Sequence, residues 1–528
     1  MADRPADFET AIKACGFGRF NIFLLMAGLP VVLAACFASA VISYILPSAE
    51  CDLNLDLLDK GILNAITYCG MIISAMGWGY LADKKGRRNL LICGHLLDVI
   101  CVLCAAMSQS RTQLMIAKFF SGIVMCGPFA ILVSYLSEFH GSHFRMRIMM
   151  IVGIMISIAT LTMPLLAIVV LPADWNFQIF NMNFVAWKVY LAVCGLPSLL
   201  SSVIFGFFPE SPRFLISQGR NTEALEVFRK MYAANTGKSK DTYPIQELIK
   251  EIKQKDEGSL NKIQVATIEA NTKDICNEGN PEMGTNNVKD ATLMDKQPNI
   301  FKTLCSRQYL GLSIQVCLIE FFIMIGQNTL RLWLPQLFAS LNEYEQISNE
   351  STSMCTIFEY SVNKTNLMKN STDECVVIIT PSSYTNNIIV GCVGFIIYLA
   401  AGTLITAIGN KRIQVIGLTV AGSCGIALYW SSTSLTTLIL TSTYSALGSM
   451  SASSAIGSSV NLFPTSLRTM IVSLTLMIGR IGSIAGNVVF PIFMSFGCIP
   501  PIAMIGIVLY LGCLLCAFLP NSNKVELK

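Results

Sequence analysis

Apolar runs of about 20 residues recur along almost the whole of this 528-residue chain, and they constrain its fold more than any other feature. A helix of roughly that length is needed to cross about 30 Å of hydrocarbon. The chain is 53% hydrophobic and only 13% charged, against about 25% charged in soluble domains. We therefore predict an all-α membrane protein with twelve transmembrane helices. The predicted spans are 20–46, 61–82, 89–108, 113–136, 147–171, 185–208, 309–338, 385–408, 413–433, 436–460, 470–496 and 499–519.

A charged turn with the sequence GYLADKKGRR, Gly79 to Arg88, separates the second and third spans. Charged groups cost about 3 kcal/mol each at the bilayer centre, so this turn lies at a bilayer face. Its four Lys and Arg residues assign that face to the cytoplasm. Both termini and the segment 209–308, which holds 15 of the chain's 37 Lys and Arg residues, then lie in the cytoplasm as well.

The loop 339–384 falls on the opposite, lumenal or extracellular side in this topology. It carries all of the chain's N-glycosylation sequons, which agrees with that assignment. The sequons are at Asn349, Asn363 and Asn370. Cys355 and Cys375 share this loop and its oxidising side, so we predict a disulfide between them, with two free thiols as the alternative.

The spans divide the chain into two six-helix bundles joined by a linker. The predicted parts are an N-terminal bundle at 1–208, a cytoplasmic linker with short helices and a disordered tether at 209–308, a C-terminal bundle at 309–519, and a cytoplasmic tail at 520–528.

Two short helices are predicted in the linker. The first covers 221–236, with Asn221 or Thr222 as its cap and Gly237 as its stop. Its apolar stripe comprises Leu225, Phe228, Met231 and Tyr232. The second is predicted at 244–256.

The two bundles are predicted to be repeats, because polar markers of the first recur in the second at a constant offset of 323 positions. The matched pairs are Gly79 and Gly402, Asp83 and Thr406, Gly86 and Gly409, Glu138 and Asn461, and Arg145 and Arg468. A parallel six-plus-six repeat is typical of transporters that hold their site between the halves, near the midplane.

The chain resembles the major facilitator superfamily at three motifs. GYLADKKGRR is similar to the family's GxxxDRxGRR loop, FPESPRFL at 208–215 resembles the PESPR motif of the sugar-porter branch, and YLSEFHGSHFR at 135–145 resembles the end of span four. The opening FETAIKACGFGRFNIFLL and the glycosylated loop after span seven resemble the synaptic vesicle glycoprotein 2 group, in particular its invertebrate relatives. The resemblance covers about 8–519.

Two departures from these patterns bear on function. Span seven reads CLIEFFIMIGQNTLRLWLP in place of the sugar porters' Gln-Gln-x-x-Gly stretch, which weakens a sugar interpretation. The AACFASAVIS stretch of span one lacks the acidic pair common in the vesicle-glycoprotein group, so no proton or cation site is expected there.

The charged turn and its polar neighbours form a candidate cytoplasmic gate. The resemblance implies that its acids pair with its arginines and hold an outward-open state; a merely solvated, topology-setting loop is the alternative. The gate candidates are Gly79, Asp83, Gly86, Arg87, Arg88, Glu138, Arg145, Arg147, Glu210 and Arg213. Because Thr406 and Asn461 replace two acids in the second copy, we expect a latch centred on the N-terminal half.

Ionisable residues inside spans are candidates for substrate binding or coupling, because they are costly in a membrane. Glu320 in span seven and Arg480 in span eleven lie at equal predicted depth, and the resemblance implies that these spans are neighbours. We therefore predict a Glu320–Arg480 ion pair, either structural or involved in coupling.

Three further ionisable residues lie in spans three and four. Lys118 takes the place of Arg in the family's RxxxG pattern, so it either faces the cavity or extends to the outer surface. His95 and Asp98 share one helix face and are predicted to pair, as a structural contact or a pH sensor. The serine-rich stretch 448–459 either lines a polar cavity or serves close helix packing.

The leading functional interpretation is a transporter that moves a small organic solute, an organic ion or a sugar-like molecule, by alternating access. The alternative is a non-transporting membrane protein of the vesicle-glycoprotein type that acts by binding a ligand or partner. No catalytic motif, cofactor site, metal site or nucleic-acid surface is expected. We expect a monomeric, multi-pass protein of the plasma membrane or an intracellular vesicle membrane, with a small-molecule solute and a coupling ion as candidate partners.

Overall fold

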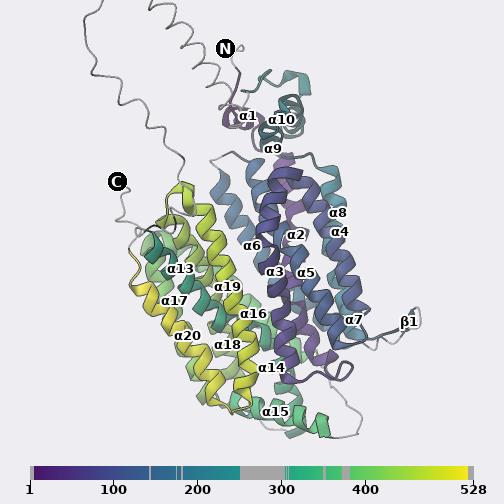
Figure 1. Cartoon of the computed structure of the whole chain (residues 1–528), viewed down its shortest axis with the longest axis vertical. Helices are drawn as coiled ribbons and strands as arrows, with labels where there is room; N and C mark the ends of the chain where they lie inside the picture. Colours follow the sequence, from purple (N-terminus) through teal and green to yellow (C-terminus); the bar gives the residue numbers. More distant parts are fainter. Residues whose placement is uncertain are drawn as a thin grey trace, which may run out of the picture.

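The computed structural model describes residues 5–141, 144–173, 175, 177–179, 182–249, 304, 306, 309–348, 352–370 and 381–520. Helices dominate the chain, and they form two bundles that stand side by side along the long axis of the molecule (Figure 1). The N-terminal half forms one bundle and the C-terminal half the other.

The N-terminal bundle follows the predicted spans closely. Its sixth span is interrupted at Gly195, which separates two shorter helices. The helices are α2 (Arg19–Ala49), α3 (Leu57–Lys85), α4 (Arg87–Ala106), α5 (Arg111–Glu138), α6 (Arg145–Val170), α7 (Ala186–Cys194) and α8 (Leu196–Phe207).

The C-terminal bundle contains the remaining membrane helices. Its first span runs on to Ser348, ten residues beyond its predicted end, through a π-helical segment labelled η3. The elements are α13 (Leu310–Ile323), η3 (Met324–Asn328), α14 (Thr329–Ser348), α16 (Ser382–Ile408), α17 (Asn410–Ala427), η4 (Leu428–Trp430), α18 (Ser434–Leu462), α19 (Thr465–Met494) and α20 (Ile499–Ala517).

Eleven helical segments within the described residues are long and apolar enough to cross a membrane. α18 occupies the place of the remaining predicted span and has 29 residues. It falls outside the eleven because serine and threonine side chains lower its mean hydropathy.

A small cap covers the end of the N-terminal bundle that carries the charged turn, and we call this end the charged-turn face (Figure 1). The predicted helix at 221–236 is confirmed there as α10, but the predicted cap at Asn221 or Thr222 is wrong, because Arg220 precedes the helix and makes no side-chain capping bond. Gly237 ends it in a left-handed conformation with a φ of 73°. The elements of the cap are α1 (Phe8–Cys15), α9 (Pro212–Ser217), α10 (Asn221–Thr236) and η2 (Lys240–Thr242).

The second helix predicted in the linker, at 244–256, is wrong over its described part. Residues 244–249 contain no helix, and Leu248 forms a β-bridge with Ala6. The backbone groups on either side of Leu248 bond to Ala6 instead of to a helical turn. Residues 250–256 lie outside the described chain.

The opposite end of the molecule, which we call the disulfide face, carries β1 (Phe177–Ile179), β2 (Met182–Phe184) and α15 (Met354–Asn370). The two strands pair antiparallel between α6 and α7. Asn363 is exposed on α15; the Asn349 sequon and the side chain of Asn370 lie outside the described structure.

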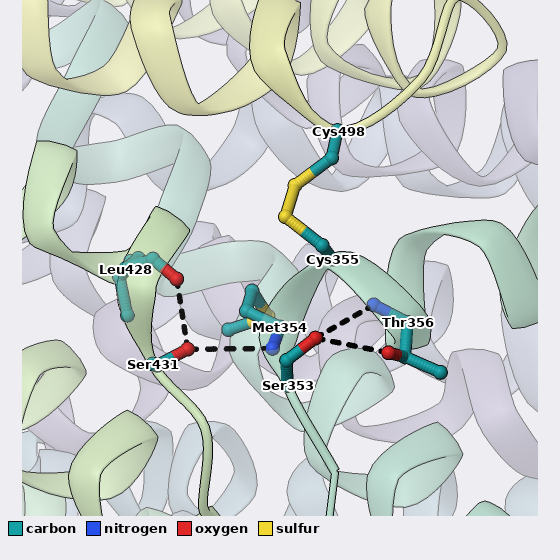
Figure 2. Close-up of a disulfide and its surroundings, with 7 residues drawn as sticks. All are labelled: Ser353, Met354, Cys355, Thr356, Leu428, Ser431 and Cys498. Carbon is teal, nitrogen blue, oxygen red and sulfur yellow. Dashed lines mark hydrogen bonds between the residues drawn. A yellow bond between two sulfur atoms is a disulfide. The ribbon is translucent and has the colours of Figure 1, made fainter.

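The predicted Cys355–Cys375 disulfide is wrong, because Cys355 is bonded to Cys498 (Figure 2). Cys498 directly precedes α20, and its Cα lies 5.0 Å from that of Cys355. The turn between α19 and α20 lies on the same face as α15, which brings a cysteine from outside the loop next to Cys355. Cys375 lies outside the described residues.

The predicted repeat is visible in the backbone. Gly86 and its counterpart Gly409 precede α4 and α17 with φ values of 88° and 90°. Arg88 donates to the carbonyls of Phe205 and Gly206 at the end of α8, and Lys411 likewise donates to a carbonyl just after α20. In each half, a cationic side chain next to the turn donates hydrogen bonds to carbonyl groups at the C-terminal end of that half's last helix.

We predict that Cys355→Ser and Cys498→Ser lower the melting temperature of the detergent-solubilised protein by the same amount. Each removes the same crosslink, which stabilises a fold by about 2–4 kcal/mol. The double variant should be no less stable than either single variant. Cys392→Ser, at a free and exposed position, is the control. Non-reducing peptide mapping that links Cys355 to Cys375 would contradict the assignment.

Candidate functional site

A cavity of about 280 Å³ lies between the two halves, walled by α2, α6, η3, α14, α16 and α18. Its lining combines aromatic rings, hydroxyls, amides and aliphatic groups. Arg331 is the one charged residue among the described lining residues. A cavity of this size, between the two halves of a helical bundle, suits a small molecule.

The π-helical segment η3 shapes one wall of the cavity. A π turn widens a helix locally and is frequent at functional sites. Here it places Gln327 and Asn328 in the cavity wall. Gly326 is needed behind them, because a Cβ there would lie 2.8 Å from the Tyr444 hydroxyl and 2.9 Å from Val508.

Hydrogen bonds fix the polar side chains of this wall. Gln327 donates to the Ser449 hydroxyl at 2.6 Å, and the Tyr398 hydroxyl donates to the Ser449 carbonyl at 2.8 Å. Arg331 donates through Nη2 to Asn328 Oδ1 at 2.8 Å. Ser449 belongs to the serine-rich stretch of α18, so that stretch does line a polar cavity.

The two halves are joined on the disulfide-face side of the cavity. The Tyr384 hydroxyl donates to the Tyr44 carbonyl at 3.2 Å, and their rings stack with centroids 6.3 Å apart. Gln336 donates to Glu50 at 3.5 Å. A Cβ on Gly61 of α3 would collide with the Asn487 carbonyl on α19, which shows how closely these helices pack.

A buried ion pair supports this closure. Glu50 Oε1 lies 2.7 Å from Lys60 Nζ, and both side chains are at most 3% exposed. Gln336 thus connects α14 of the C-terminal half to a charge pair of the N-terminal half. Removing one partner would leave the other charge buried and unpaired.

Among the described residues, fewer bonds join the halves toward the charged-turn face. Tyr68 bonds to Asn328 and Arg480 bonds to Cys126 across the halves, both near mid-depth. Nearer the charged turn, a Cβ added to Gly77 or Gly402 would meet nothing within 4 Å.

The charged turn itself is bonded within the N-terminal half. Arg87 Nε lies 3.3 Å from Glu138 Oε1, and its Nη2 lies 3.4 Å from Asp83. Glu138 is buried and also accepts bonds from Ser134 and Ser211. The Asp83 side chain is 81% exposed, so Glu138 is the better-held acid in this conformation.

The Glu210 carboxylate accepts hydrogen bonds from backbone N–H groups, and in the described chain it forms no ion pair with an arginine side chain. Its Oε1 accepts from the N–H groups of Arg87 and Arg88 at 3.0 and 3.1 Å, which caps the N-terminus of α4. Gly86 admits this carboxylate, because a Cβ there would collide with it. Gly79 has open space around it.

Three other gate arginines, Arg88, Arg147 and Arg213, form no ion pair with the predicted acids in the described chain. Arg88 bonds to backbone carbonyls, Arg147 lies over the Phe144 ring, and Arg213 lies over the Phe8 ring. The predicted acid partners are instead held by Arg87, serines and backbone N–H groups. Arg145 begins α6, and its side chain lies outside the described structure.

The predicted Glu320–Arg480 ion pair is absent from this conformation of the described chain. Glu320 is fully buried, and its carboxylate oxygens have no hydrogen-bond partner there. α13 and α19 are neighbours as expected, but Gly479 faces Glu320: a Cβ on it would lie 2.9 Å from Glu320 Cγ. Successive helix positions point in different directions, and Arg480 turns to Cys126 at 3.2 Å.

The predicted His95–Asp98 contact is also absent. His95 Nδ1 bonds to the Leu91 carbonyl at 2.7 Å, while Asp98 accepts from Ser121 and Ser198.

Lys118 lies beside this group rather than in the central cavity. It is 2% exposed and donates to the Ala38 carbonyl at 2.9 Å. It therefore reaches neither the outer surface nor the central cavity, and with Asp98 it lines a separate void among the helices of the N-terminal half.

Sequence reasoning missed Arg331 and the Glu50–Lys60 pair. Arg331 lies inside the predicted seventh span and carried the same signal as Glu320, a charge within an apolar run. Glu50 and Lys60 fell in a predicted outer loop, where a charge needs no explanation.

Comparison with known proteins identifies relatives of the chain. A family model described as "Sugar (and other) transporter" matches residues 17–325. Synaptic vesicle glycoprotein 2B of Rattus norvegicus is 32% identical over 244 residues, which cover 44% of this chain and 36% of that protein. Synaptic vesicle glycoprotein 2A of Homo sapiens is 30% identical over 230 residues, which cover 43% of this chain and 31% of that protein. The match thus spans only about a third of the length of these curated relatives.

Two solved structures are similar over nearly the whole chain. The inward open conformation of the xylose transporter XylE from E. coli has a TM-score of 0.64 at 17% identity, covering 96% of this chain and 98% of that one. A bacterial homolog to the human lysosomal transporter Spinster, in an inward-facing conformation, has a TM-score of 0.55 at 10% identity, covering 96% of this chain and 95% of that one. These likenesses show the fold, which is the major facilitator arrangement of two six-helix bundles.

We predict that Glu50→Gln destabilises the protein by about 3–5 kcal/mol, because it leaves the Lys60 ammonium buried without a counter-charge. The charge swap Glu50→Lys with Lys60→Glu should recover much of the loss. Thermal unfolding in detergent measures both. Glu223→Gln, which breaks an exposed pair with Arg220, is the control and should change little. Equal destabilisation by the control and Glu50→Gln would contradict the prediction.

Proposed function

We propose that this chain, which belongs to the sugar (and other) transporter family of the major facilitator superfamily, moves a small organic solute across a membrane by alternating access. The observation that carries the proposal is the cavity between the two halves, where the bonds between halves among the described residues gather on the disulfide-face side and at mid-depth. A site of that form is exposed to one side of a membrane at a time when the halves rock against each other.

We further propose that the charged-turn face is cytoplasmic, so that the structure represents an inward-facing state. The basic residues of the charged turn support this orientation. The Cys355–Cys498 bond supports it independently, because disulfides persist on the oxidising side of a membrane. Residence in the plasma membrane or in a vesicle membrane is compatible with both observations.

The gate proposal centres on Asp83. In this conformation its carboxylate is exposed, and its one ion pair within the described chain is the 3.4 Å contact with Arg87. It is therefore available to a partner on the other half when the charged-turn ends approach each other. Glu138 and Glu210, in contrast, stabilise the turn in the present state and are proposed to support its shape throughout the cycle.

Glu320 is the candidate for ion coupling. Its buried carboxylate lacks a partner in the described chain, and an unpaired anion at such a site is costly. Arg480, on the neighbouring helix and bonded across to Cys126, is the candidate that would pair with it in another state.

Solute flux in proteoliposomes tests the transport proposal. We expect uptake of at least one class of small organic solute, with saturation and with exchange against solute loaded inside. The alternative is a non-transporting protein of the vesicle-glycoprotein type, which is supported by the lack of acids in α2 and by the neutral residues Thr406 and Asn461 in the second copy of the charged turn. Specific binding without flux for every solute class would support that alternative and contradict transport.

For the gate, we predict that Asp83→Asn shifts the protein toward the present conformation. It removes a carboxylate that is largely exposed here, where it contacts Arg87 at 3.4 Å, and that is proposed to gain a partner on the other half when the charged-turn ends meet. Cys36 lines the cavity and reports access. Its alkylation from the charged-turn side, measured by peptide mass spectrometry, should rise, while the exposed control Glu223→Gln leaves it unchanged. Equal labelling of both variants would remove Asp83 from the gate.

A further inference from the structure

We propose that the central cavity takes a small organic anion and that Arg331 holds its negative group. The inference rests on the proposed function, because it names the class of solute for the same site. Arg331 lies on α14, close to the π-helical segment, and its half-buried side chain forms part of the cavity wall.

Most N–H donors of the Arg331 guanidinium have no hydrogen-bond acceptor within the described chain. A guanidinium carries five N–H donors. In the described chain Arg331 makes one hydrogen bond, to Asn328 Oδ1 at 2.8 Å, and no ion pair. The remaining donors are left to water or to a ligand. Their planar, forked arrangement matches the oxygens of a carboxylate, sulfate or phosphate group.

The acids of the described chain do not neutralise Arg331. Glu50 forms its ion pair with Lys60 at 2.7 Å, beyond the closed end of the cavity. Glu320 packs against Gly479 on α19 and makes no bond to Arg331. A cation without an ion pair inside a membrane-spanning bundle is costly and marks a candidate functional site. An anionic ligand would supply the missing counter-charge.

The rest of the wall indicates what kind of anion fits. Tyr44, Phe395 and Tyr398 present aromatic surface, and Gln327 with Ser449 presents an amide and a hydroxyl. These groups suit a compact, partly apolar body that also carries hydrogen-bonding atoms. A neutral sugar would leave Arg331 without a counter-charge, and an organic cation would be repelled by it.

A series of small phenyl compounds isolates the charge. The probes are benzoate, phenyl phosphate and phenyl sulfate as anions, benzamide as the neutral analogue and benzylamine as the cation. Binding to the purified full chain is measured by titration calorimetry and by ligand-induced thermal stabilisation. We expect at least one anion to bind tenfold more tightly than benzamide and benzylamine.

Substitution of Arg331 then tests the residue. Arg331→Gln should weaken binding of that anion at least tenfold, whereas Arg331→Lys, which keeps the charge without the fork, should retain part of it. Arg412→Gln removes one positive charge at an exposed position on α17, outside the cavity, and should leave binding unchanged. Elution of every variant as a monodisperse species shows that it is folded.

Three results would overturn the inference: no anion of the series binds, benzamide or benzylamine binds as tightly as the anions, or Arg331→Gln retains the affinity of the wild-type protein. Flux measurements distinguish a failure of the anion-site inference from a failure of the proposed transport function. Anion binding without uptake would leave the site assignment intact and contradict transport. If a neutral solute is taken up and its uptake does not change in Arg331→Gln, the transport proposal stands and the anion-site inference is contradicted.

Discussion

The cost of a charge in hydrocarbon governs the arrangement of this protein. Most buried charges that the structure describes have a specific partner: Glu50 has Lys60, and Glu138 has Arg87. Lys118, Asp98 and Arg480 are held by hydrogen bonds without an ion pair in the described chain. Arg331 and Glu320 matter most for the proposals made above. Arg331 lines the central cavity without an ion pair, and Glu320 is buried without a hydrogen bond. Both lie on the π-interrupted helix formed by α13, η3 and α14, which therefore carries both the proposed ligand-binding residue and the proposed coupling residue.

The two halves share a backbone plan but differ in their polar contacts. Gly86 and Gly409 start equivalent helices with similar positive φ values. Arg87 in the first half is bonded to buried Glu138, whereas its counterpart Asn410 donates to the Ser454 carbonyl and the Ser458 hydroxyl on α18. Neutral hydrogen bonds thus replace an ion pair in the second half. This difference is the reason for placing the proposed charge-dependent gate in the N-terminal half.

The sequence predicted the fold well because hydrophobic length and charge asymmetry are local properties that a membrane enforces. It predicted the site less well. The disulfide prediction failed because Cys498 is distant in sequence but adjacent to Cys355 in space. The Glu320–Arg480 prediction obtained depth and helix adjacency correctly, but it could not resolve which side of α19 faces α13. Arg331 could have been predicted as a site residue from the sequence, because it is a charge inside a predicted span, the criterion already applied to Glu320.

The central claim is that the two halves rock about a single cavity. It is tested most directly by measuring distances between labels on the two halves, at Met76 of α3 and Leu404 of α16, both exposed toward the charged-turn face. Labels attached through non-canonical amino acids avoid the native thiols. Double electron–electron resonance should give two distance populations whose ratio changes when a bound solute or Asp83→Asn is introduced. A single distance that is the same under all conditions would contradict alternating access.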